Sequence, residues 1–388
     1  MPNRIRVGLV GCGNISHSHL NAYRALADRF EVRAVCDVVE LKARARAAEF
    51  GANSPQSGAP RLTTRFEDLL EMPDLDVIDI TTPPYLHTPF ALRALAAGKD
   101  AFVEKPVGGS LAEIDALIAA ELQTGRRVMP IFNYRFGFAA QRLRHLLRLG
   151  IPGRAYLSTV ETHWRREIPY FNVRWRMGWR TALGGAFIGH AIHAHDTLYS
   201  IVGPAKSVYA RAKTLVNPTE VEDTLAVSLE MAGGSLAALS VTFGSWTEIS
   251  RHRYCFENLT AESNTSPYAG HTSDPWTFVG RTPVVDAQIR EALSDFTPVP
   301  PEGFPGQFDR YYKAIQAGSE LPTTLADARA AIELTTAVYH SAAANQPVDL
   351  PIANDHPAYA GCIPADALPL ADLTDYEHYD SPWTPTGV

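Results

Sequence analysis

The chain has 388 residues, and at this length two domains are expected because single hydrophobic cores stop growing at about 250–300 residues. Hydrophobic residues make up 46% and charged residues 20%, which is typical of a soluble globular protein. The net charge of −7 argues against nucleic acid or an anionic membrane as the main partner.

Four scattered cysteines without a CxxC pair favour free thiols in a reducing compartment, so a cytoplasmic location is expected. The sequence contains no long apolar segment, and we therefore expect neither a signal peptide nor a membrane span.

The first element is a short apolar strand at residues 4–10, and a helix is predicted over residues 17–26. Between them lies the glycine turn Gly11, Cys12, Gly13, Asn14 and Ile15. Such a turn lets backbone N–H groups approach a pyrophosphate at the positive end of the helix. Because Ser16 replaces the third glycine of the usual fingerprint, a tight turn without a ligand stays open as an alternative.

The second strand, residues 31–36, ends at Asp37. An acidic residue at this point would bind the ribose 2′-hydroxyl of NAD and would repel the extra phosphate of NADP. Basic residues do lie on the next helix, so NAD is preferred and NADP is the less favoured cofactor. Asp37 also suits a helix cap, which is compatible with the cofactor role.

Three further strands are predicted at residues 77–81, 101–103 and 128–132, with helices between them. The first is followed by Thr82, Pro83, Pro84 and His87, and the second by Glu104, Lys105 and Pro106. This alternation predicts a parallel sheet with right-handed crossovers. Ligands bind beyond the carboxyl ends of such strands. The glycine turn, Asp37, residues 82–87 and Lys105 all fall at these ends.

Lys105 is the residue on which the other features converge. A lysine at a strand end carries a positive charge on a fixed backbone, and Pro106 permits a cis peptide that would aim the ammonium sideways. An ordinary surface lysine before a turn is the alternative interpretation.

From Asn133 onward the pattern changes to a mostly antiparallel sheet, which predicts a second domain. Its strands are expected at residues 155–164, 207–214, 224–230, 235–243 and 250–257, and its helices at residues 139–149, 307–317 and 325–344. Residues 258–278 read as a polar ordered loop or insertion, and residues 350–388 as an extended proline-rich tail. One face of the sheet is a candidate surface for a partner subunit.

A histidine-rich segment follows the pair Gly184-Gly185. On a regular helix His190, His193 and Asp196 would share one face. One of the histidines would suit a general base, or the three histidines could bind a metal, but no known zinc motif is present and no metal is predicted. Packing histidines at a domain junction are the third possibility.

Together these residues resemble the glucose-fructose oxidoreductase / inositol dehydrogenase / rhizopine catabolism (Gfo/Idh/MocA) family. The specific elements are Gly11–Ile15, Thr82-Pro83-Pro84 with His87, Glu104-Lys105-Pro106, and Gly184-Gly185 followed by His193 and Asp196. The resemblance implies an α/β protein with a Rossmann dinucleotide-binding domain, residues 1–132, and an α+β substrate-binding and oligomerisation domain with a large open mixed or antiparallel sheet, residues 133–350. Residues 351–388 are the expected C-terminal tail.

The resemblance also implies roles for individual residues. Lys105 matches the catalytic lysine and His193 the catalytic histidine. Substrate binding is expected from Tyr134, Arg165, Trp175, Arg176, His190 and Asp196. Cofactor binding is expected from Gly11, Gly13, Asn14, Ile15, Asp37, Thr82, Pro83, His87, Glu104 and Lys105. The family's usual aspartate four residues before the histidine is Gly189 here, and His190 or Asp196 is hypothesised to compensate.

The predicted function is oxidation of a ring hydroxyl of a sugar, inositol or related polyol by hydride transfer to NAD(P). The expected assembly is a homo-oligomer, a dimer or a homotetramer. Two alternatives are an NAD-dependent glycosidase acting by transient oxidation and elimination, and a non-catalytic nucleotide-binding sensor.

Overall fold

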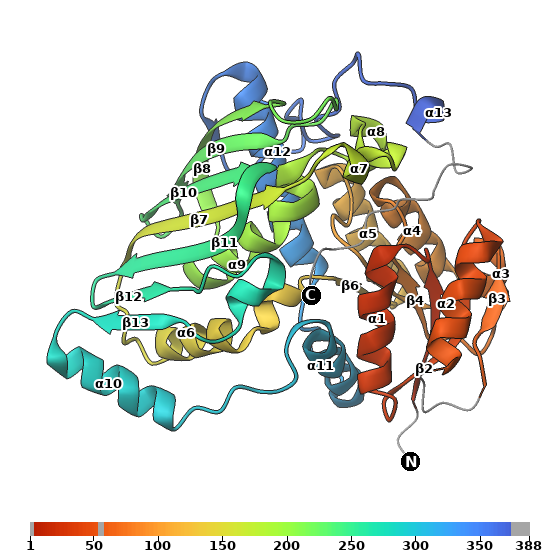
Figure 1. The fold of residues 1–388 in the computed structure, drawn as a ribbon, viewed down its shortest axis with the longest axis horizontal. Coiled ribbons are helices and arrows are strands. Elements are labelled where there is room, and N and C mark those ends of the chain that lie inside the picture. Colours follow the sequence, from red (N-terminus) through yellow and green to blue (C-terminus); the bar gives the residue numbers. More distant parts are fainter. Residues whose placement is uncertain (1–3, 53–57, 374–388) are drawn as a thin grey trace. The chain divides into compact units, whose positions relative to one another are not determined.

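The computed structural model describes residues 4–52 and 58–373 (Figure 1). It divides into two compact units. The first unit combines Met1–Phe132 with Phe304–Arg329, and the second combines Asn133–Gly303 with Ala330–Val388. The return of Phe304–Arg329 to the first unit is not indicated by the sequence pattern. The domain limits expected from the sequence stay a prediction.

The first unit contains, in its described residues, a six-stranded parallel sheet in the order β3-β2-β1-β4-β5-β6. Its strands are β1 (Ile5–Val10), β2 (Phe30–Cys36), β3 (Arg61–Thr63), β4 (Val77–Ile80), β5 (Asp100–Val103) and β6 (Val128–Pro130). Most are apolar runs buried on both faces, as expected of parallel strands. The predicted Rossmann-type sheet is therefore confirmed. Only β3 was not predicted, because three residues are too few for a pattern.

Helices cover both faces of this sheet, and all of them except α11 connect its strands. They are α1 (Asn14–Ala25), α2 (Glu40–Ala52), α3 (Phe66–Glu71), α4 (His87–Ala96), α5 (Leu111–Thr124) and α11 (Gly303–Ala317). The first turn of α1 begins directly after Gly13, three residues earlier than expected. Helix α4 begins at His87, directly after the 3-10 turn Pro84–Leu86.

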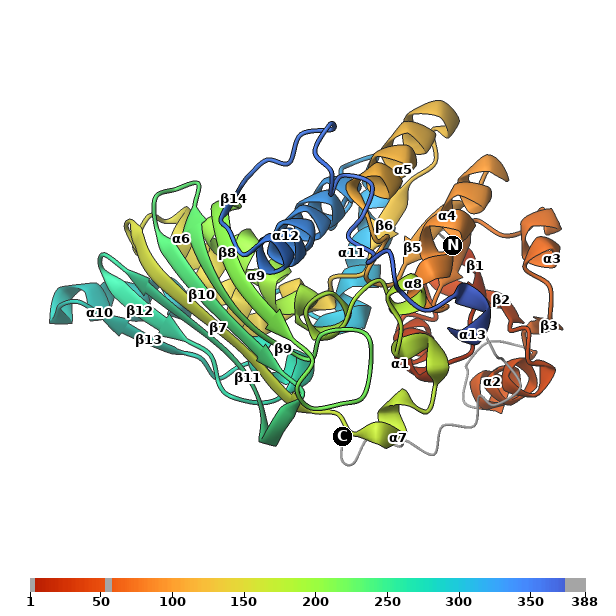
Figure 2. The same cartoon turned by 90° about the horizontal axis from the view of Figure 1, so that it is seen from above.

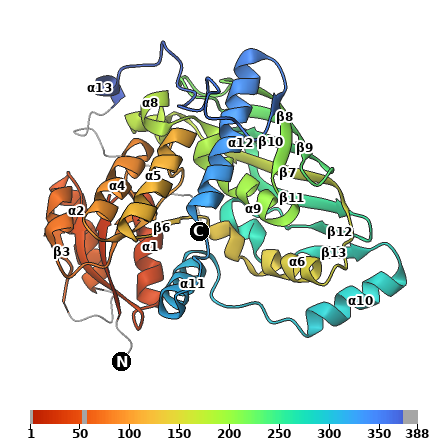
Figure 3. The same cartoon turned by 180° about the vertical axis from the view of Figure 1, so that it is seen from behind.

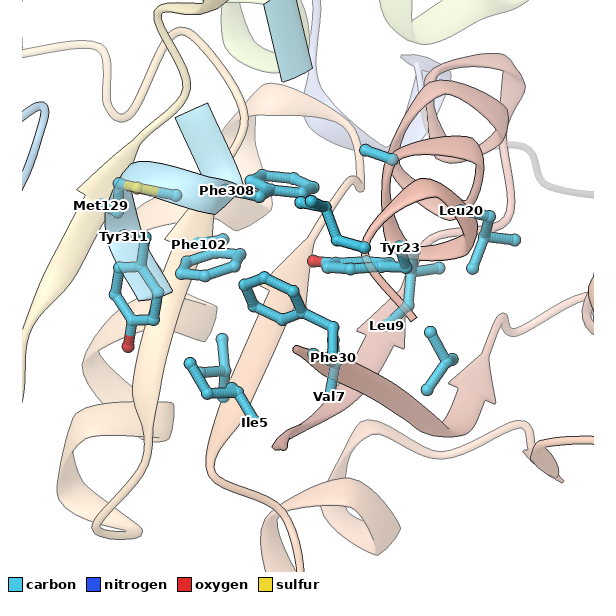
Figure 4. Close-up of a cluster of buried hydrophobic side chains, with 14 of the residues drawn as sticks. Ile5, Val7, Leu9, Leu20, Tyr23, Phe30, Phe102, Met129, Phe308 and Tyr311 are labelled. Atoms are coloured by element: carbon cyan, nitrogen blue, oxygen red, sulfur yellow. The ribbon is translucent and has the colours of Figure 1, made fainter. Parts of the chain in front are cut away.

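The core of the first unit lies between the sheet and the helices α1, α2 and α11. Helix α11 contributes Phe308, which stacks on Tyr23 of α1 with ring centroids 4.9 Å apart and on Phe102 of β5 at 5.2 Å (Figure 4). Tyr311 meets Phe102 edge-on at 4.5 Å. These buried rings explain why a segment some 170 residues downstream of β6 belongs to this unit. Helices α4 and α5 cover the opposite face (Figure 2).

The second unit contains, among its described residues, an eight-stranded sheet in the order β13-β12-β11-β7-β10-β9-β8-β14. Its strands are β7 (Ala155–Arg165), β8 (Ala205–Lys213), β9 (Thr224–Met231), β10 (Leu236–Thr242), β11 (Gly244–Phe256), β12 (Leu259–Glu262), β13 (Thr277–Gly280) and β14 (Val348–Asp349). The β10–β7 pair is parallel and the other pairs are antiparallel. The expected large mixed sheet is confirmed.

The helices of the second unit are α6 (Phe138–Arg148), α7 (Ile168–Phe171), α8 (Trp179–Ala182), α9 (Ile192–Val202), α10 (Pro283–Ser294), α12 (Leu325–Ala344), whose first five residues belong to the first unit, and α13 (Leu370–Leu373). Helices α9 and α12 lie on the same side of the sheet (Figures 2 and 3). No helix in residues 4–52 and 58–373 has the length and apolar character needed to cross a membrane.

Two expectations about the second domain are wrong. Residues 258–278 are not a loop, because β12 and the start of β13 extend the sheet on either side of a 3-10 turn, Tyr268–Thr272. Four-residue strands show too little alternation to be recognised. The tail from residue 350 is not wholly extended, because it includes α13; residues 374–388 lie outside the described part of the chain.

Helix α10 was also missed, although its start carries ordinary signals. The Thr282 hydroxyl accepts a hydrogen bond from the Val285 N–H, and Pro283 occupies the first turn.

The histidine segment begins with a π-helical turn, Phe187–Ala191, before α9. Glu222 anchors this turn, because its carboxylate accepts hydrogen bonds from the N–H groups of Gly185 (2.7 Å) and Phe187 (2.9 Å) and from the Tyr339 hydroxyl (3.0 Å). Burial raises the pKa of Glu222 to about 7, although these donors oppose the shift. The expectation of one regular α-helix is therefore wrong.

The glycines of this segment differ in what they tolerate. A Cβ at Gly185 would lie 1.8 Å from the Glu222 carbonyl oxygen. Apart from its chain neighbours and the backbone of its own helix, a Cβ at Gly189 would meet no atom of the described residues within 4 Å. Packing therefore requires glycine at Gly185, and no steric reason requires it at Gly189.

We expect Gly185→Ala to lower the free energy of unfolding by about 3 kcal/mol or more, because backbone must move to relieve the contact. Gly189→Ala, the matched control, should stay within about 1 kcal/mol of the parent. Differential scanning calorimetry of both variants measures this difference. Equal melting temperatures would contradict the role given to the Gly185–Glu222 contact.

Candidate functional site

The glycine turn of the first unit is shaped by a close approach of backbone. Gly11 has a φ of +96°, and a Cβ there would lie 2.7 Å from backbone atoms of Thr81 and Thr82. Gly13 lies directly before α1, and apart from its chain neighbours a Cβ there would meet no atom of the described residues within 4 Å. The buried Ser16 hydroxyl donates to the Gly13 carbonyl at 2.6 Å. The serine therefore supports the turn, and open space remains where a pyrophosphate would approach the helix.

Asp37 ties the end of β2 to the glycine turn. Its carboxylate accepts hydrogen bonds from the N–H groups of Cys12 (2.8 Å) and Val39 (2.9 Å). A carboxylate has about four lone-pair sites, so these two bonds leave capacity for a ribose hydroxyl. The Arg46 guanidinium also reaches the turn, 3.2 Å from the Gly13 carbonyl oxygen. From the sequence, Arg46 is only one of several basic residues on the next helix.

The loop after β4 contains a polar atom without a partner. Thr82 Oγ1 is buried and has no hydrogen-bond partner among the described residues. His87 lies behind this loop, with Nε2 2.8 Å from the Thr82 carbonyl oxygen and Nδ1 2.7 Å from that of Pro106. Burial lowers the pKa of His87, although both carbonyls oppose the shift. The imidazole therefore braces the loops that follow β4 and β5.

Glu104 and Lys105 extend from the end of β5. The Glu104 carboxylate is buried, and it accepts a hydrogen bond from the Lys105 backbone N–H at 3.0 Å. Its other oxygen lies 3.0 Å from Nε2 of the fully buried His19. Burial would raise the pKa of Glu104, but His19 and Lys105 outweigh it and the pKa is lowered. The Lys105–Pro106 peptide is cis, as the sequence permits.

Sequence reasoning missed His19. It lies within a predicted helix, between Ser18 and Leu20, and nothing in the pattern separates it from an ordinary helical residue. Glu104, expected to bind the cofactor, directs its carboxylate to His19 and to the Lys105 N–H.

In the second unit, His193 of α9 stacks on Tyr134, with ring centroids 4.4 Å apart and an interplanar angle of 18°. Tyr134 also meets His271 edge-on at 5.3 Å. One turn after His193, Asp196 forms a two-point ion pair with Arg135, at 2.6 and 2.7 Å. The 3-10 turn Asn133–Phe136 therefore contacts both His193 and Asp196.

His190 has different neighbours. Its Nε2 lies 3.0 Å from the Tyr170 hydroxyl, and its ring meets Trp164 and Phe243 edge-on. His190, His193 and Asp196 were predicted to share one face of a regular helix. That prediction is wrong for His190, since it lies in the π-helical turn and the other two lie in α9.

His195 is buried against Phe187, and burial lowers its pKa to about 3. It is a neutral packing residue. Within the described part of the chain, no three His, Cys, Asp or Glu side chains converge as metal ligands would.

The arginines near β7 divide into two kinds. Arg165 is exposed; it pairs with Glu167 and lies over Trp246 at 4.3 Å. Arg166 is buried, donates to Glu248 at 2.9 Å, and lies 5.3 Å from the ring centroids of Trp164, Tyr170 and Tyr268. Arg166 is a residue that the sequence analysis missed.

Arg176 covers Tyr170 at 4.2 Å and Trp175 at 5.1 Å. The expected substrate residues Trp175 and Arg176 therefore lie together, with Tyr170 linking them to His190. Arg165 lies in a separate set of contacts with Glu167 and Trp246.

Comparison with known proteins gives one family for both units. Residues 5–132 match the model described as an oxidoreductase family with an NAD-binding Rossmann fold, and residues 140–256 match the GFO/IDH/MocA C-terminal domain. The solved WlbA dehydrogenase from Bordetella pertussis, in complex with NADH and UDP-GlcNAcA, superimposes with a TM-score of 0.79 at 27% identity. That match covers 90% of this chain and all of the other.

Two curated relatives differ in activity. A glycosyl hydrolase family 109 protein from Shewanella putrefaciens is 30% identical over 193 residues, which are 47% of this chain and 41% of that protein. Levoglucosan dehydrogenase from Pseudarthrobacter phenanthrenivorans is 25% identical over 263 residues, which are 61% of this chain and 67% of that protein.

The family expectation from the sequence is thus confirmed, and the glycine turn, the orphaned Thr82 hydroxyl and Asp37 fit a dinucleotide. The chain belongs to the Gfo/Idh/MocA family of oxidoreductases, and its first domain is an NAD-binding Rossmann domain.

Proposed function

We propose that this protein is an NAD-dependent dehydrogenase that oxidises a ring hydroxyl of a sugar, an inositol or a related polyol. The observation that carries the proposal is the placement of Lys105, directly after the Glu104 carboxylate, at the same edge of the sheet as the glycine turn and Thr82. The likeness to a levoglucosan dehydrogenase and to a dehydrogenase solved in complex with UDP-GlcNAcA supports the substrate class.

The first unit would hold the cofactor. The turn Gly11–Ile15 would bind the pyrophosphate at the start of α1, and Asp37 would bind the ribose. Thr82 and Pro83 would contact the part of the cofactor beyond the pyrophosphate. His87 and Glu104 would support the loops that hold it. When bound, NAD supplies the acceptor for a hydride. The carboxylate of Asp37 supports NAD over NADP, since it would repel a ribose phosphate.

Lys105 and His193 would perform the proton chemistry. The Lys105 ammonium would stabilise negative charge on the substrate oxygen as it loses its proton. His193 would accept that proton, and the stacked Tyr134 ring would hold the imidazole in orientation. Tyr134, Arg165, Trp175, Arg176, His190 and Asp196 remain the proposed substrate residues.

The family's usual aspartate is Gly189 in this chain. Asp196 is a poor candidate to replace that aspartate, because Arg135 binds both of its carboxylate oxygens. His190, held by the Tyr170 hydroxyl, is the better candidate.

A glycosidase is the second candidate function, and the match to a family 109 glycosyl hydrolase favours it. The same residues would then remove and return protons during elimination and hydration. We also infer a homo-oligomer, dimer or tetramer, in the cytoplasm. Exposed apolar side chains on the sheet strands support a subunit contact; they are Tyr156, Leu157, Tyr209 and Leu236.

A substrate panel separates the two functions. We expect inositols, aldoses or anhydrosugars with NAD to yield reduced cofactor in proportion to product, followed by its absorbance. Release of the leaving group from nitrophenyl glycosides, with bound NAD and no net NADH, would establish the glycosidase instead. Lack of either reaction across the panel would contradict both.

With a substrate identified, Lys105→Met and His193→Asn should each lower kcat by about 10²–10⁴-fold, because each removes a group that acts on the reacting proton or charge. Steady-state kinetics measures the loss, and melting temperatures within a few degrees of the parent serve as the control. Near-normal turnover of either variant would remove that residue from the mechanism.

Asp37→Asn should shift the ratio of kcat/KM for NAD over NADP toward NADP by about tenfold, since it removes the charge that repels a phosphate but keeps an oxygen for the Cys12 N–H. Adding Arg46→Ala should reverse part of this gain, because Arg46 is the cation at the glycine turn. An unchanged ratio in Asp37→Asn would mean that Asp37 only holds the glycine turn and does not select the cofactor.

A further inference from the structure

We propose that His19 is a positioning residue for Lys105, acting through the Glu104 carboxylate that it holds inside the first unit. The proposal rests on the catalytic role proposed for Lys105. It assigns a function to a buried histidine of α1 that neither the sequence motifs nor the family comparison singles out.

The imidazole of His19 joins two carboxylates from neighbouring strands. Nδ1 lies 2.9 Å from Asp79 Oδ2 and 3.0 Å from Oδ1, and Nε2 lies 3.0 Å from Glu104 Oε1. Asp79 belongs to β4, and Glu104 directly follows β5. Both ring nitrogens must donate to serve two carboxylates, so the ring is a cation that bridges the two strands.

The bridge continues to the backbone of Lys105. Glu104 Oε2, the oxygen not used by His19, accepts the Lys105 N–H at 3.0 Å, and the Glu104 N–H donates to the Ile80 carbonyl at 3.0 Å. The residue before Lys105 is thus held by its backbone and by its side chain. Because the side-chain restraint depends on where the carboxylate lies, His19 sets the point from which the lysine side chain leaves the strand.

The charges of the group balance. Asp79 and Glu104 supply two negative charges, and His19 and Lys105 supply two positive ones. The Tyr23 hydroxyl also donates to Asp79, at 2.7 Å. A buried carboxylate that loses its cation takes up a proton or moves toward water. Protonation would weaken its bond to the Lys105 N–H, and movement would break it.

Aromatic rings of α11 close the site against solvent. Phe304 and Phe308 lie 4.9 and 5.4 Å from the His19 ring, which is fully buried. Burial alone would lower the pKa of His19, but Asp79 and Glu104 raise it to about 10. The titratable groups that face the ring are therefore Asp79, Glu104 and, through Asp79, Tyr23.

Two amide variants separate positioning from general stability. An asparagine amide nitrogen can occupy the place of Nδ1 and donate to Asp79 only, whereas a glutamine amide nitrogen can reach the place of Nε2 and donate to Glu104. His19→Asn should lower kcat by about 10–100-fold with the KM for substrate and the affinity for NADH within about threefold of the parent. His19→Gln should recover a large part of that loss.

Glu104→Gln tests the next link, because His19 and the Lys105 N–H use different oxygens of the carboxylate, and glutamine replaces one of these oxygens by an NH2 group that cannot accept. It should resemble His19→Asn in kcat. Tyr23→Phe is the matched control: it removes a hydrogen bond from the same buried group on the side away from Lys105. It should lower the melting temperature, since Asp79 loses a buried hydrogen-bond donor, and leave kcat within about twofold of the parent.

The charge on His19 has a separate readout. A cation whose pKa is raised from 6.5 to about 10 by folding adds stability that is fully present below pH 6.5 and is lost as the pH rises through about 10. The parent should therefore lose more stability between pH 7 and pH 10 than His19→Gln, measured by thermal melting. Parallel pH profiles would show that His19 is not charged in the fold.

The outcomes separate this proposal from the proposed function. If Lys105→Met is inactive while His19→Asn and Glu104→Gln keep normal kcat, the positioning role is overturned and the catalytic lysine stands. If Lys105→Met keeps normal turnover, the proposed function fails first. Equal losses of kcat in His19→Asn, His19→Gln and Tyr23→Phe, in step with melting temperature, would mean that His19 is structural only.

Discussion

Parallel pairing of β1, β4 and β5 is the constraint on which the nucleotide site depends. Val10 pairs with Ile80 and Ile80 with Val103, so these strands end level with one another. The residues that follow them are therefore brought to one edge, where helix N-termini and free backbone groups favour an anionic ligand. Gly11 allows this register, because any side chain there would strike the backbone after β4.

Close to that edge of the sheet, the first unit contains buried charged groups that solvent does not reach. His19, Asp79 and Glu104 are buried under the rings of α11, a helix that belongs to this unit although it follows most of the second unit in the chain. Buried ion pairs seldom stabilise a fold more than apolar packing would. A specific geometry at the end of β5 is a physical reason for keeping such a group, and the lysine of the proposed mechanism is the next residue.

In the second unit, too, a buried carboxylate fixes the backbone beside predicted site residues, here together with a glycine. Glu222 binds the N–H groups at the start of the histidine segment, and Gly185 lets the two backbones meet. The π-helical turn that follows separates the contacts of His190 from those of His193. π-Helical turns are often found at functional sites, because they redirect a side chain without ending the helix.

The sequence alone determined the Rossmann domain, the mixed sheet, the family and the residues of the glycine turn and of the Glu104-Lys105 pair, because strand period, glycine spacing and short motifs are local properties of the chain. Only the tertiary structure decided the partners of those residues. It revealed His19 and Arg166, which resemble ordinary core and surface residues until distant strands and loops surround them. It also assigned Asp196 to Arg135, and α11 to the first unit. Such contacts depend on elements far apart in the chain, and no local pattern encodes them.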